Sequence, residues 1–98
     1  MTADSTLAEL PGADLVRDGI RDLERGDATA NALLIAMAAP RLRHAGVDVP
    51  AGAIAGRPSH QLYELLASEN GLSAHSRYNA LVRRIVSFAR AAEHARSG

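Results

Sequence analysis

The sequence predicts an all-α fold, an irregular bundle of four main helices with a short N-terminal arm. Apolar residues recur at intervals of three and four over most of the chain, which is the period of amphipathic helices. No run of alternating apolar and polar residues between turn signals indicates a β-strand. Because 98 residues is the usual size of one domain, we expect residues 1–98 to share one core.

The chain begins with a segment that we expect to be a loosely attached arm, residues 1–12. Residues 4–6 can cap a short helical turn, but Pro11 and Gly12 interrupt it. The first main helix is then predicted over residues 13–25, with Gly26 as its stop. One side of this helix is charged, and the other side carries the apolar residues Leu15, Val16, Ile20 and Leu23.

The second helix is predicted to be central, because apolar residues cover more than half of its circumference. Asp27 or Thr29 can cap it. Pro40 lies inside the apolar pattern and lacks a backbone donor, so the helix should kink or break near residues 38–40, with Arg41 and Arg43 facing outward. Its apolar residues are Leu33, Leu34, Ile35, Met37 and Leu42.

A long connection is expected over residues 46–58, which contain three glycines and two prolines without a sustained period. Val47, Val49 and Ile54 should attach this segment to the core.

The third helix is predicted from Pro58 to about Asn70, with Gly71 after its end. Leu62, Leu65 and Leu66 should face inward, with Tyr63 at the margin. Ser73 or Ser76 then caps the last helix, which runs to about Ala95 and carries the longest apolar face of the sequence.

The composition indicates a core with few large side chains. Apolar residues make up 47% of the chain, but 20 of them are alanine, which removes little area from water. With no cysteine to form disulfides, a second subunit is the expected way to complete the core. Our leading hypothesis is therefore a small bacterial protein–protein interaction module that forms a homodimer. The expected interface is on the last helix, at Tyr78, Leu81, Ile85 and Phe88.

The alternative hypothesis is a DNA-binding domain that uses residues 62–90. This segment resembles a helix-turn-helix in the spacing of Ala67, Gly71 and Leu72, although Arg77 stands where that motif has a buried aliphatic residue. An ordinary corner between two helices has the same spacing. The residues expected to meet DNA are His75, Arg77, Asn79 and Arg83.

Charge is balanced over the chain but is unevenly divided. There are eleven arginines, no lysine and eleven acidic residues, and the net charge is −3 over residues 1–50 and +3 over residues 51–98. On the last helix Arg83, Arg90 and His94 follow one outward line, and Arg77 and Arg84 follow another. These lines are either a solvated helix face or a stripe that binds anions.

A third hypothesis is a small-molecule or metal-binding protein. His60 and Glu64 lie four residues apart and would share a helix face, but two ligands do not make a metal site. No phosphate-binding loop, nucleophile elbow or zinc-protease motif is present, so we expect neither an enzyme nor a bound cofactor. No signal peptide or membrane span is apparent either, which favours a cytoplasmic location.

Overall fold

Helices follow one another throughout the part of the chain that the structure describes, which confirms the predicted all-α class. The computed structural model describes residues 9–50 and 56–97, with side chains up to Ala95. No strand occurs within these two ranges. The elements are α2 (Ala13–Arg25), α3 (Ala30–Met37), α4 (Ala39–His44), α5 (Pro58–Asn70), the 3-10 turn η1 (Gly71–Ser73) and α6 (Ala74–Ser97).

Helix α2 has the bounds that the sequence predicts, because glycine is found at both of its ends. Gly12 precedes it with φ +89° and Gly26 follows it with φ +78°, a region that side chains with a Cβ rarely adopt. At the end of the helix the N–H of Gly26 donates to Leu23 O (3.0 Å) and that of Asp27 to Asp22 O (2.9 Å). These two bonds satisfy carbonyls that the helix would otherwise leave unpaired.

The predicted central helix is broken as expected, and its two parts are α3 and α4. Ala38 ends the first part, and Pro40 stands in the first turn of the second, where its missing N–H costs nothing. Four consecutive residues of α3, Ala32 to Ile35, are buried. The helix that was predicted to be central is therefore surrounded by the rest of the chain.

Thr29 is the cap of α3, one of the two residues that the sequence offered. Its hydroxyl accepts a hydrogen bond from Ala32 N (3.1 Å) and donates one to Asp22 Oδ2 (2.6 Å). The side chain therefore satisfies the start of α3 and also links it to α2.

Replacing Thr29 by alanine is expected to lower the free energy of unfolding by about 1 kcal/mol, because an orphan N–H at the helix start loses its acceptor. Urea denaturation of the variant measures the loss. Thr29→Ser is the matched control and should retain most of the stability, since serine also carries a hydroxyl. An equal loss in both variants would show that the hydroxyl is not the stabilising group.

The part of the connection after α4 that the structure describes, up to Pro50, is attached to the rest of the chain. Val47 and Val49 are buried, as predicted. Arg43 does not simply face solvent: its guanidinium donates to Val49 O (3.0 and 3.3 Å) and Pro50 O (3.2 Å). Ile54 and residues 1–8 of the expected arm lie outside the described residues, whereas Leu10 packs against the core.

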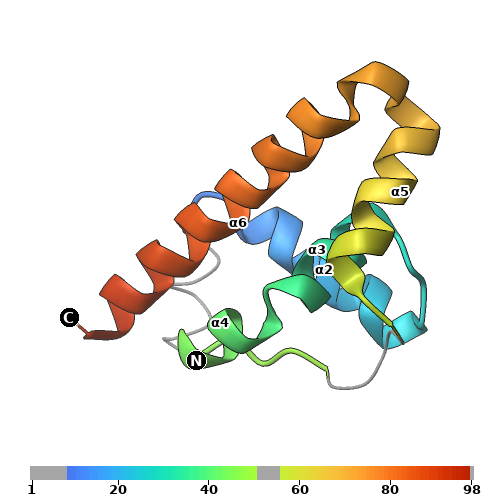
Figure 1. Ribbon diagram of the computed structural model, residues 1–98. Helices are drawn as coiled ribbons and strands as arrows, with labels where there is room; N and C mark the ends of the chain where they lie inside the picture. The colour runs from blue at the N-terminus through green and yellow to red at the C-terminus, as the bar shows by residue number, and fades with distance from the viewer. Residues whose placement is uncertain (1–8, 51–55, 98) are drawn as a thin grey trace.

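The helices are arranged around α3, which contacts α2 on one side and α5 on the other. Figure 1 shows α5 and α6 as the two sides of a V that meet at η1, with the shorter helices packed near its open end. An ion pair between Arg41 and Glu93 (3.5 Å) links α4 to the C-terminal half of α6. The predicted end of α5 at Asn70 is confirmed, and α6 begins at Ala74, so Ser76 lies inside the helix.

Within the described ranges one chain buries most of its large apolar side chains, and all of the others except two are partly buried. The buried residues come from each of the helices α2 to α6 and, after α4, from Ala45, Val47 and Val49. Two large apolar residues are exposed, Tyr63 at 40% and Leu72 completely. Among the described residues, no helix combines the length and the apolar character that crossing a membrane requires.

Candidate functional site

The face of α6 that was expected to form a dimer interface lies in the core of a single chain. Leu81 is 8% exposed, and Ile85 and Phe88 are each 2% exposed. Tyr78 is half-buried, and its hydroxyl donates to Met37 Sδ at 3.4 Å. Within one chain these side chains are already buried or partly buried against the core.

The turn between α5 and α6 lacks the buried contacts of a helix-turn-helix. Ala67, Leu72 and Arg77 are all exposed, whereas the motif packs residues at these positions between its two helices. Of the four residues expected to meet DNA, His75, Asn79 and Arg83 follow one another at intervals of four and share one line of α6, whereas Arg77 does not. Asn79 Nδ2 lies 3.1 Å from His75 Nε2, and Arg77 points about 160° away from His75 around the helix.

The exposed side of α6 carries charge of one sign. We call this surface the basic face. Rows of cationic side chains flank a line of small ones, so the centre of the face is smooth and its margins are charged. The basic residues are the arginines Arg77, Arg83, Arg84 and Arg90 together with His94, and the small residues between the rows are Ser76, Ala80 and Ser87.

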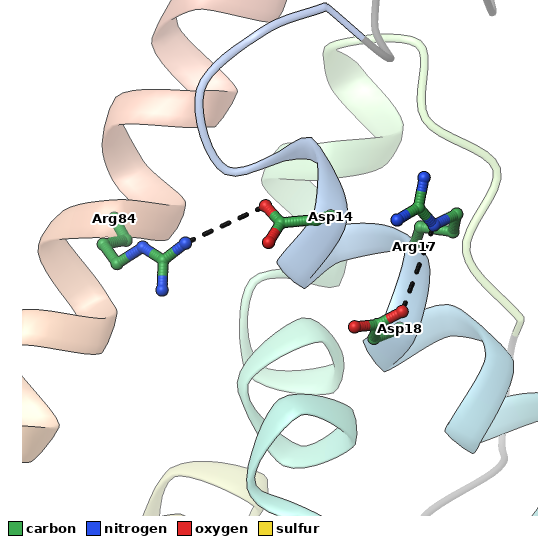
Figure 2. Close-up of polar contacts among 4 residues, drawn as sticks. All are labelled: Asp14, Arg17, Asp18 and Arg84. Atoms are coloured by element: carbon green, nitrogen blue, oxygen red, sulfur yellow. Dashed lines mark ion pairs between the residues drawn. The ribbon is translucent and has the colours of Figure 1, made fainter.

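Few acidic groups neutralise the basic face. Arg84 forms a long ion pair with Asp14 of α2 (3.9 Å), which Figure 2 shows, and both side chains are more than half exposed, so water screens the pair. Arg77, Arg83 and Arg90 form no ion pair with any described residue. By contrast, α2 exposes both signs of charge, as in its Arg17–Asp18 pair (4.0 Å, Figure 2).

The basic face is hollowed near its middle, beside the loop that leads into α2. The hollow has a volume of about 220 Å³ and is lined by Pro11, Gly12, Arg83, Arg84 and Ser87. Gly12 is favoured at this place by its φ of +89°, and a Cβ added there would make ordinary contact with Phe88 Cβ, at 3.4 Å. The loop therefore forms a wall against which an anionic group between the two arginines could rest.

A second hollow lies between the first turns of α5 and α6, and we call it the fork pocket. Its volume is about 390 Å³. Three aromatic rings meet there: the centroids of Tyr63 and Tyr78 are 5.6 Å apart, and those of Tyr63 and His75 are 6.4 Å apart. The lining residues are Arg57, Ser59, His60, Tyr63, His75, Tyr78 and Asn79.

Of the two metal candidates His60 lines this pocket, and Glu64 pairs with it. His60 Nε2 is 3.4 Å from Glu64 Oε2, and both side chains are exposed. Within the described ranges no third histidine, cysteine or carboxylate joins them in a group that could hold a metal ion. The arrangement is that of an ordinary helix surface pair.

The sequence did not predict that His60 and His75 line the same pocket. Their common surroundings depend on the angle between α5 and α6, which local sequence does not encode. A signal was nevertheless present, because a histidine near the start of each helix is followed by a tyrosine three residues later, His60 by Tyr63 in α5 and His75 by Tyr78 in α6.

Comparison of the chain with protein-family models, with curated proteins and with solved structures finds no match. Function must therefore be inferred from the surfaces of the chain itself. The basic face and the fork pocket are the two described surfaces where chemically similar groups gather.

Proposed function

We propose that the chain is a small protein–protein interaction module that binds an acidic helix of a partner protein along the basic face. The observation that carries the proposal is the single sign of charge on the exposed side of α6. A solvated helix face usually mixes both signs, as α2 does with Arg17 and Asp18. A partner with rows of carboxylates would complement the arginine rows.

The dimensions of the basic face suit a helix. From Arg77 to His94 it extends for about 26 Å at 1.5 Å per residue, close to five helical turns. Ala80 and Ser87 lie along its centre and are small, so a second helix axis could approach to about 8 Å. Carboxylates on either side of that helix would then reach the two arginine rows.

Two other occupants are less well supported. Nucleic acid is disfavoured by the net charge of zero, because proteins that bind this polyanion usually carry an overall positive field. A second copy bound through the same face is disfavoured because two arginine-rich surfaces would repel each other. We therefore replace the expected homodimer by an acidic partner protein.

The test is a titration of ¹⁵N-labelled protein with a helical alanine-rich peptide that carries two rows of glutamates, at low salt. Amide signals of α6 between Arg77 and His94 should shift, and the shifts should decline as salt is raised and screens the charges. The double variant Arg84→Glu, Arg90→Glu should abolish them. The matched control is Arg17→Glu, Arg21→Glu on α2, which makes the same change in net charge.

Two outcomes would contradict the proposal. One is equal weakening by the control variant, which would mean that the peptide responds to net charge alone. The other is a shift of α6 signals with a 20-base-pair DNA duplex and none with the peptide, which would assign the face to nucleic acid.

A further inference from the structure

The fork pocket is a separate surface, because none of its lining residues belongs to the basic face and its α6 residues His75 and Asn79 lie about 160° from Arg77 around the helix. We propose that this pocket is a separate site for a small organic carboxylate with a flat body. The carboxylate is held by Arg57 and the two imidazoles, and the flat body packs on the ring of Tyr63.

The lining of the fork pocket determines the sign of the ligand's charge. Arg57, Ser59, His60, His75 and Asn79 all bring N–H or O–H donors, and no carboxylate lines the pocket. Glu64 is close by but is paired with His60. Arginine is charged at every physiological pH, and its planar fork of donors matches a carboxylate in two parallel hydrogen bonds.

The start of α5 adds to this preference for anions. Pro58 stands at the first helical position, and Arg57 provides no side-chain cap. The N–H groups of the first turn therefore have no side-chain acceptor and point along the axis past the start of the helix, where Arg57 stands. The positive end of the helix dipole favours a negative group at this place.

Tyr63 provides the apolar surface. It is 40% exposed, whereas every other large apolar side chain in the described ranges except Leu72 is at least partly covered. Its ring meets those of Tyr78 and His75 at angles of 58° and 62°, so two rings support it from the protein side. A supported but accessible aromatic ring is suited to pack against a flat ligand.

The volume and the donor set together select the class of ligand. About 390 Å³ is within the range of small-molecule sites, which begins near 300 Å³. No group of three metal-binding side chains lies here or elsewhere in the described ranges, so the pocket is not built for a cation. An aromatic monocarboxylate therefore matches both the charge and the shape.

The experiment compares three probes of nearly identical shape: benzoate, neutral benzamide and cationic benzylamine. Each is titrated into the ¹⁵N-labelled full chain up to about 20 mM, a range suited to the weak binding of ligands with few atoms. Benzoate should shift the signals of Tyr63, His75 and Asn79. Benzamide should bind at least about tenfold more weakly, and benzylamine should not bind.

Variants locate the site. Arg57→Gln should weaken benzoate binding by about tenfold, because a charge-assisted pair of hydrogen bonds is lost. Tyr63→Ala should also weaken it, while Arg25→Gln on α2 is the matched control and should leave it unchanged. The variant Arg84→Glu, Arg90→Glu should still bind benzoate, so failure of partner binding and failure of this site are distinguishable.

Three results would overturn the assignment: benzamide binding as tightly as benzoate, benzoate shifting signals of the basic face and not those of the pocket, or no shift at any pocket residue up to the highest concentration. The first would remove the role of charge, and the second would place the anion at Arg83 and Arg84.

Discussion

Replacing Gly19 by alanine is expected to destabilise the chain by about 2–3 kcal/mol, although alanine is the better helix former by about 1 kcal/mol. Gly19 is buried where α2 crosses α3. A Cβ there would overlap the side chain of Ile35 and lie 2.7 Å from the carbonyl oxygen of Asn31. Because one of these obstacles is backbone, rotation of a side chain cannot relieve the clash, and the helices must separate.

A double-mutant cycle in urea denaturation tests this contact. In an Ile35→Ala background the side-chain clash is absent, so Gly19→Ala should cost clearly less than it does in the unaltered chain. Part of the loss in the free energy of unfolding should remain, because the contact with the Asn31 backbone is still present. A Gly19→Ala variant that is more stable than the parent would show that α2 and α3 do not approach so closely.

Replacing Phe88 by alanine is expected to cost about 3–5 kcal/mol, a large part of the 5–15 kcal/mol that stabilises a typical domain. Phe88 is the single phenylalanine of the chain, is 2% exposed and contacts the loop at Gly12. Its removal leaves a cavity between α6 and the start of α2. For a domain of this size the melting temperature should fall by more than about 12 °C.

The same variant separates a core role from an interface role. If Phe88 stabilises one folded chain, the loss in melting temperature is the same at every protein concentration; if it joins two chains, the parent's melting temperature rises with concentration. Leu72→Ala is the matched control, because this leucine is completely exposed and its truncation should change stability by less than about 0.5 kcal/mol. A mild, concentration-dependent effect of Phe88→Ala would restore the dimer.

Most of the fold could be predicted because its signals are local. Glycines at positions 26 and 71 end helices, Pro58 begins one, and Pro40 breaks one, and each acts through the conformation of its own backbone. The apolar period then identifies the buried side of each helix. These properties depend on neighbours in the sequence, so helix bounds and inward residues were largely predictable.

The closure of the core could not be predicted by counting large side chains. Ala32, Ala89 and Ala92 are each at most 1% exposed, so they act as contact points at which helices approach closely. Gly19 does the same where α2 meets α3. Each of these residues contributes little buried area by itself. Its contribution to close packing can be recognised only when the position of the neighbouring helix is known.

The candidate surfaces were only partly predictable for a similar reason. The arginine rows of α6 follow from the helical period and were recognised as lines. The fork pocket depends on the angle at which α5 and α6 leave η1, and long-range packing against α3 sets that angle. His60 and His75 therefore could not be assigned to one site from sequence alone.

The position of α3 between α2, α5 and α6 makes the chain difficult to divide. A fragment that ends before Pro58 would leave one side of α3 in water, and a fragment that begins there would lack its support altogether. Neither half keeps a closed interior, so we expect the described helices to unfold in a single cooperative event. A ligand that binds at either candidate surface stabilises the whole folded chain, and therefore also stabilises the other surface.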